Sequence, residues 1–206
     1  MRKSLIVSGF TLISALLLGA CSGNDPAMPG MSGMSSSPSA AGAAEQSGHN
    51  ADDVSFTQQM IPHHNDAVTM AKLVPSRSSN PKIVDLASRI EKGQSPEVQQ
   101  MQGWLTTWNA SMSMPGMSSG AMPGMDGGTM PGMMSADDMK MLEQAQGTEF
   151  DKMWLDMMTK HHRGAIDMAK TELGKGVSPD AKALAQKIID AQQGEIAEMQ
   201  GLLSQS

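Results

Sequence analysis

Apolar residues recur every three or four positions in two long stretches of this 206-residue chain. This spacing places them along one face of an α-helix, and the strict alternation that is typical of a half-buried β-strand is absent. Val74-Pro75 is expected to break the first helix and Pro81 to open the second, while Gly174 and Gly176 are expected to end the third. Helices are therefore predicted over residues 52–73, 81–109 and 137–173, with a last one that begins at Ser178-Pro179.

The second stretch repeats the first. Met60–Lys72 reads MIPHHNDAVTMAK, and Met158–Lys170, which lies 98 positions later without a gap, reads MTKHHRGAIDMAK. Each copy is one helical hairpin, so the chain is predicted to form an all-α, four-helix up-and-down bundle from hairpins at residues 51–110 and 136–206. Pro62, which is present only in the first copy, is expected to kink or shorten its helix.

Three segments outside the hairpins are not expected to belong to the packed fold. Residues 1–20 combine a basic start with an apolar run too short to span a bilayer, and small residues precede Cys21. This layout predicts a lipoprotein signal with a lipid attached to Cys21, the alternative being ordinary secretion with an incidental cysteine. Residues 21–50 predict a disordered tether, and residues 111–135 a Pro- and Gly-rich linker.

The amino-acid composition excludes several classes of function. The net charge of −6 argues against a nucleic-acid partner, and a single cysteine excludes an intramolecular disulfide or a thiolate metal cluster. Methionine supplies 22 of the 206 residues, and the linker repeats Met-Pro-Gly-Met three times where no core can form. Because exposed thioethers are easily oxidised, these repeats are predicted to capture or relay Cu(I); the alternative is a low-complexity spacer.

Polar residues interrupt the apolar helix faces at matching positions of the two copies. A buried carboxylate is costly unless a charged or strongly polar group meets it, so the interior is expected to hold a site. Each hairpin contributes half of it, or holds one of two equivalent sites. The candidate residues are His63, His64, His161, His162, Met60, Met70, Met101, Met158, Met168, Met199, Glu97 and Glu195.

The donor types favour copper over iron. Di-iron bundles use Glu-x-x-His on the inner face of a helix, whereas here Met60 and Met158 stand three residues before His63 and His161. Replacing a hard carboxylate by a soft thioether shifts the preference toward Cu(I), with Cu(II) as a second possibility. The two interior glutamates are expected to orient the histidines through their second ring nitrogens.

The segment Phe150–Lys170 and the downstream motif Gln192-x-x-Glu195-Ile-x-x-Met199 resemble the bacterial domain-of-unknown-function 305 family. The resemblance covers residues 52–203 and includes His-His-x-x-Ala-x-x-Met-Ala in both copies. It implies a ferritin-like helical bundle and an extracytoplasmic copper-binding role in metal tolerance. It also suggests, as ligands, the nearby methionines together with His63, His64, His161 and His162.

The sequence thus predicts a lipid-anchored, extracytoplasmic protein that binds Cu(I) or Cu(II), for sequestration or for delivery to a copper-accepting protein. One alternative is a ferritin-like, metal-dependent oxidase at the same residues. Another is a structural or partner-binding lipoprotein without metal. In that case the interior polar groups form a hydrogen-bond network of Gln94, Glu97, Gln192 and Glu195. No motif of a hydrolase or a nucleotide-binding protein is present, and the oligomeric state is left open.

Overall fold

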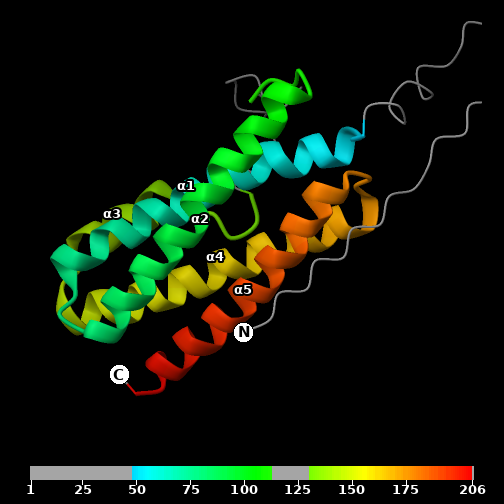
Figure 1. Cartoon of the computed structure of the whole chain (residues 1–206). Helices are drawn as coiled ribbons and strands as arrows, with labels where there is room; N and C mark the ends of the chain where they lie inside the picture. The colour runs from blue at the N-terminus through cyan, green and yellow to red at the C-terminus, as the bar shows by residue number, and fades with distance from the viewer. Residues whose placement is uncertain (1–47, 113–129, 206) are drawn as a thin grey trace, which may run out of the picture. The chain divides into compact units, whose positions relative to one another are not determined.

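The computed structural model describes residues 48–112 and 130–205, and within these ranges the chain forms helices and no strand (Figure 1). The predicted all-α class is therefore confirmed. The proposed signal segment, Cys21 and most of the linker repeats lie outside the described residues. The helices are α1 (Ala51–Arg77), α2 (Pro81–Thr107), α3 (Ala136–Gln144), α4 (Gly147–Lys175) and α5 (Pro179–Leu203).

The long helices form two hairpins that pack on each other. Helix α1 pairs with α2 and α4 pairs with α5, and the two hairpins meet mainly where α1 packs against α4 (Figure 1). Long side chains add contacts between α2 and α5: Arg89 Nη2 lies 2.6 Å from Glu198 Oε1, and Lys187 Nζ lies 3.2 Å from Glu97 Oε1. The predicted helical bundle is present, with the short α3 as an addition.

Capping residues set the starts of the helices. The Asn50 side chain accepts hydrogen bonds from the backbone N–H groups of Asp52 and Asp53, and the Asp53 carboxylate accepts one from the Asn50 N–H. This reciprocal arrangement is a capping box. Helices α2 and α5 each begin with a proline that follows a capping residue, Asn80 and Ser178. The starts predicted at these two prolines are confirmed.

Helix α1 is longer than predicted, because two prolines do not end it. The chain stays helical through Pro62, so the shortening expected there does not occur, and it continues through Pro75 to Arg77. A proline removes one backbone donor from a helix, but tertiary packing can offset that loss. Val74 is fully buried beside Pro75, and its carbonyl accepts the Ser78 N–H at 2.9 Å, which holds the last turn.

The single helix predicted over residues 137–173 is wrong, because α3 and α4 are separate. Ala145 and Gln146 are extended. Gly147 has a φ of 57°, a backbone conformation that residues with a Cβ rarely adopt. Ala145 and Phe150 on either side of the break are nevertheless buried. The apolar periodicity therefore continues across the break and conceals it.

Two apolar clusters fill the bundle, and each takes residues from both hairpins. Phe150 and Trp154 of α4 join the cluster next to the α1–α2 turn, and Phe56 of α1 joins the cluster next to the α4–α5 turn. Trp154 also donates its indole N–H to the Met70 carbonyl of α1 at 3.1 Å. Neither hairpin can bury its apolar face alone, which is why the two must associate.

Candidate metal centre

Four histidines lie inside the bundle, two on α1 and two on α4, and all are 0% exposed. The rings of His63 and His161 face each other with centroids 3.7 Å apart and planes at 38°. The rings of His161 and His162 are 6.3 Å apart. The two copies of the motif are therefore brought together across the α1–α4 interface.

Two of these histidines are held by glutamates on the partner helix of their own hairpin. His64 Nε2 lies 2.8 Å from Glu97 Oε2, and His162 Nε2 lies 2.7 Å from Glu195 Oε2. A carboxylate only accepts hydrogen bonds, so the imidazole Nε2 must carry the proton. The lone pair of each ring is then on Nδ1, which is the arrangement by which outer carboxylates orient metal-binding histidines.

The other two histidines have different partners, which break the symmetry of the repeat. His63 Nε2 donates to the Pro131 carbonyl at 3.0 Å. His161 Nε2 lies 3.4 Å from Asp66 Oδ2, without the geometry of a hydrogen bond. Neither Asp66 nor Pro131 was predicted from the sequence. The position equivalent to Asp66 in the second copy is Gly164, so the repeat does not identify Asp66. The signal that could have found Asp66 is its place three residues after His63, on the same face of α1.

The Nδ1 atoms of the four histidines are buried and have no hydrogen-bond partner within the described residues. Such orphaned atoms are rare, and each calls for a specific explanation, such as an ion at the site. Both side-chain polar atoms of Gln94, and Oε1 of Gln192, are also unpartnered there. The interior hydrogen-bond network that the sequence offered as an alternative to metal is thus incomplete at both glutamines.

The buried histidines that face each other are neutral. Burial is the main cause that lowers the pKa of His63, and the nearby His161 adds to it while the Pro131 carbonyl opposes it; the resulting pKa is about 2. Burial also lowers the pKa of His161, and the Asp66 carboxylate offsets part of that effect. A neutral imidazole keeps the lone pair that a metal ion requires, so these rings need no deprotonation to act as ligands.

All six candidate methionines are buried, and they divide between the two apolar clusters in the mirrored pattern of the repeat. Thr159 Oγ1 donates to the sulfur of Met199 at 3.8 Å, a contact that Ile61 cannot make in the first copy. Their role as ligands stays a prediction, since buried methionine is also an ordinary core filler. One cluster contains Met70, Met158 and Met199, and the other contains Met168, Met60 and Met101.

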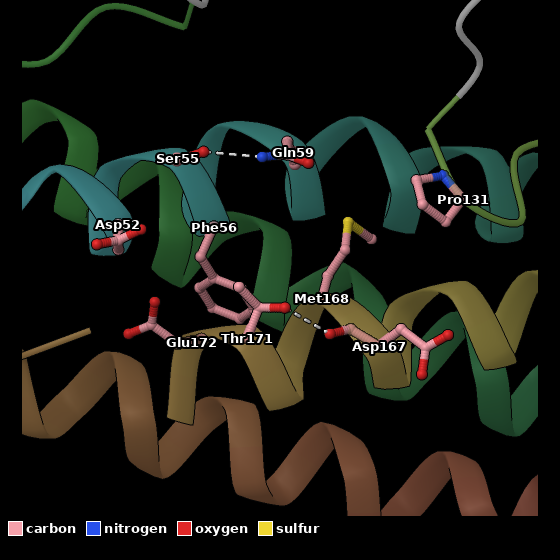
Figure 2. A pocket seen from close by; sticks show the side chains of 9 residues that line it. All are labelled: Asp52, Ser55, Phe56, Gln59, Pro131, Asp167, Met168, Thr171 and Glu172. Carbon is pink, nitrogen blue, oxygen red and sulfur yellow. Dashed lines mark hydrogen bonds between the residues drawn. The ribbon is translucent and has the colours of Figure 1, made fainter. Parts of the chain in front are cut away.

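No group of three or more His, Cys, Asp or Glu side chains is arranged to hold a metal ion within residues 48–112 and 130–205. A centre at the facing imidazoles would therefore need thioether donors as well. A cavity of about 240 Å³ opens beside this region between α1 and α4 (Figure 2). Its lining includes Met168 and the carboxylates of Asp52, Asp167 and Glu172, with Pro131 at one end.

Two duplicated helical hairpins that enclose mirrored histidine pairs define a class of helical bundle with an imidazole-lined interior. The chain belongs to the DUF305 family, described as a domain of unknown function, which it matches over residues 53–203. The family resemblance predicted from the repeated motif is thereby confirmed.

Solved structures of the same fold include proteins that bind metal. A DUF305 protein of Streptomyces coelicolor, described as a candidate secreted protein, has a TM-score of 0.67 and 32% identity, over 75% of this chain and 93% of that one. CopM in its Cu(I)-bound form has a TM-score of 0.60 and 28% identity, over 74% and 96%. CopM has also been solved in Cu(II)-bound and Ag-bound forms.

A curated relative, the uncharacterized protein L153 of Acanthamoeba polyphaga mimivirus, is 39% identical over 54 residues. This match spans 26% of the present chain and only 36% of that protein. It therefore adds nothing on function. Among the helices that the structure describes, none is both long and apolar enough to cross a membrane.

Proposed function

We propose that this protein binds copper at the His63–His161 interface outside the cytoplasmic membrane, and that it sequesters or delivers Cu(I) in metal tolerance. The facing imidazoles would supply nitrogen donors and the buried methionines sulfur donors. Cu(II) would be held mainly through the imidazoles. A lipid on Cys21 would keep the bundle at the membrane surface, where a copper-accepting protein could meet it.

One observation carries this proposal: four imidazoles are buried between the hairpins with their Nδ1 atoms unpaired. Leaving a buried polar atom without a partner costs about 1–3 kcal/mol, and this cost recurs at each of the four rings. A metal ion that uses these lone pairs would remove the cost. The copper-bound forms of CopM, which share this fold, support the choice of metal.

The donor set favours Cu(I) binding over an oxidase. A dinuclear oxidase of the ferritin type draws on several interior carboxylates, whereas Glu97 and Glu195 are engaged with histidine Nε2 atoms here. Imidazole and thioether donors suit Cu(I), which accepts few ligands of soft character. The proposal is therefore one of storage or transfer without turnover.

Copper affinity tests the proposal directly. In the variant His161→Ala/His162→Ala, anaerobic competition with a Cu(I) chelator should show loss of the tightest copper, with helicity by circular dichroism largely retained. His49→Ala is the matched control, because His49 stacks on Trp108 with centroids 4.7 Å apart, away from the four interior rings. Unchanged copper stoichiometry in the double variant would contradict the ligand assignment.

The lipid anchor needs a separate experiment, since Cys21 lies outside the described residues. Replacing Cys21 by Ser removes the thiol to which a lipid would be attached. The protein should then move from the membrane fraction to the soluble extracytoplasmic fraction, while its copper affinity stays the same. Membrane association that survives this change would refute the anchor and leave the copper site untouched.

A further inference from the structure

The last Met-Pro-Gly-Met repeat of the linker lies within the described residues and forms a tight turn on the bundle. The Met133 N–H donates to the Met130 carbonyl at 3.0 Å, and Gly132 has a φ of 84°. Proline followed by a glycine with positive φ is the signature of a type II turn. We name residues Met130–Met133 the docked turn.

The docked turn is packed against α4 too closely for any side chain to intervene. A Cβ on Gly164 of α4 would overlap the carbonyl group of Pro131 and lie 3.0 Å from the Cα of Gly132. A Cβ on Gly132 would lie 2.9 Å from the Lys160 carbonyl oxygen and 3.0 Å from that of His161. In both cases the atoms that the added Cβ would meet belong to the backbone, so turning a flexible side chain cannot relieve the overlap.

The docked turn also reaches α1. The Pro131 carbonyl accepts the Nε2–H of His63, and the Met134 N–H donates to Asp66 Oδ2 at 3.4 Å. Gly164 and Asp66 occupy equivalent positions in the two copies of the repeat, 98 residues apart. The two copies therefore differ where they contact the docked turn. Gly164 of the second copy leaves space for it, and Asp66 of the first copy provides a hydrogen-bond acceptor.

We propose that the docked turn is a positioning element of the metal centre, in which the Pro131 carbonyl fixes the tautomer of His63. A carbonyl accepts only, so the His63 proton stays on Nε2 and the lone pair stays on Nδ1. Glu97 does the same for His64 and Glu195 for His162. The inference rests on the proposed function, in which the unpaired Nδ1 of His63 is a ligand of copper.

Pro131 of the docked turn also lies at the cavity between α1 and α4. Its side chain lines one end of this acidic cavity (Figure 2). Its carbonyl accepts the Nε2–H of His63. Pro131 therefore contacts both the cavity and the buried ring. Displacing the docked turn would remove the carbonyl partner of the His63 ring and change one end of the cavity.

Two variants that displace the docked turn test the inference, each with a matched control. Gly164→Ala introduces the overlap with Pro131, whereas Gly174→Ala adds the same methyl group to α4 with nothing within 4 Å. Gly132→Ala adds positive-φ strain and a backbone clash. Gly48→Ala adds the strain alone, since Gly48 has a φ of 68° and nothing within 4 Å.

The first readout is the ¹⁵N spectrum of the metal-free protein, with the His63 signals assigned by a His63→Ala sample. Wild type and both controls should show the His63 proton on Nε2 only. Gly164→Ala and Gly132→Ala should show a mixture of the two tautomers. A proton on Nδ1 in wild type, or an unchanged spectrum in both displacing variants, would overturn the inference.

The second readout is Cu(I) affinity. Loss of an outer-shell partner of a metal ligand weakens binding by about 10- to 100-fold, and this loss is expected in the two displacing variants but not in the controls. Wild-type Cu(I) affinity in both displacing variants would overturn this inference and leave the proposed function intact. A wild-type protein that binds no Cu(I) would instead contradict the proposed function.

Discussion

Two carboxyl groups, those of Asp53 and Glu172, meet where the start of α1 lies against the end of α4. Both are buried, at 0% and 1% exposure. Asp53 accepts the backbone N–H groups of Val177 at 3.1 Å and Ser178 at 2.9 Å, which ties the α4–α5 connection to α1. The Glu172 oxygens have no donor from the described part of the protein when ionised, so Glu172 bonds to Asp53 only in its protonated form.

The two carboxyl groups titrate in opposite directions. Burial is the main cause that raises the pKa of Glu172, and the neighbouring Asp53 carboxylate adds to it; the resulting pKa is about 8. Burial would also raise the pKa of Asp53, but the hydrogen bonds from Glu172 and from backbone N–H groups outweigh it and lower that pKa. At neutral pH the pair therefore holds one proton, on Glu172.

Stability should fall as the solution becomes alkaline. The folded-state pKa of Glu172 is raised, so its contribution is fully present below the ordinary value of 4.5 and is lost as the pH rises through about 8. The melting temperature of the metal-free protein should fall between pH 5 and pH 9. In Glu172→Gln, whose amide stays neutral and can still donate to Asp53, this fall should be much smaller.

Glu149→Gln is the control for this measurement, because Glu149 is an exposed residue of the same helix. It should retain the wild-type slope of melting temperature against pH. A Glu172→Gln protein with the wild-type slope would show that another group is responsible.

Single residues of the interior were predictable only where the repeat marked them. The histidine pairs and Glu97 and Glu195 were found because they recur at a fixed spacing on apolar faces. Asp66 and Pro131 were missed because they have no counterpart in the other copy. A carbonyl partner is also invisible to any reasoning from side-chain chemistry.

The contact between α1 and α4 decides how the two hairpins join. Ala67 and Ala165 are both fully buried there, and small residues at these positions let the helix axes approach. The Trp154 indole of α4, bonded to the Met70 carbonyl of α1, fixes the register of the two helices. The facing histidines depend on this spacing, since they are held by the same pair of helices.

Ala165→Val should weaken this interface. Two extra methyl groups in a packed core typically cost about 1–3 kcal/mol of unfolding free energy, because neighbours must move away. Ala191→Val on the exposed face of α5 is the control, and it should cost less than about 0.7 kcal/mol from helix propensity alone. Urea denaturation measures both, and equal costs would show that Ala165 has room to spare.

Helices were predictable from the sequence where a local signal marked their ends, and not elsewhere. Proline after a capping residue identified the starts of α2 and α5. The end of α1 was wrong because the burial of Val74, a tertiary effect, outweighs the local effect of Pro75. The break between α3 and α4 was missed because Gly147 lies within an uninterrupted apolar periodicity.

The whole bundle is a duplicated structure whose two halves have become unequal. The docked turn lies over the His63–His161 pair as a single segment, and residues 48–112 and 130–205 contain no mirrored counterpart to it. Lys187 contacts Glu97 at 3.2 Å, but its equivalent in the first copy, Arg89, contacts Asp85 and Glu198 instead. The inequality of the two halves therefore arises from the linker and from these charged side chains.

Copper stoichiometry distinguishes a shared centre from two separate ones. Because the His63 and His161 rings are only 3.7 Å apart, we expect one centre to which both hairpins contribute. His63→Ala/His64→Ala and His161→Ala/His162→Ala should then each abolish the tightest Cu(I) completely, as measured by anaerobic chelator competition. Two independent centres would instead leave each variant with half of the tightly bound copper. The first result would show that the two histidine pairs, which lie on opposite sides of one interface, act as a single site.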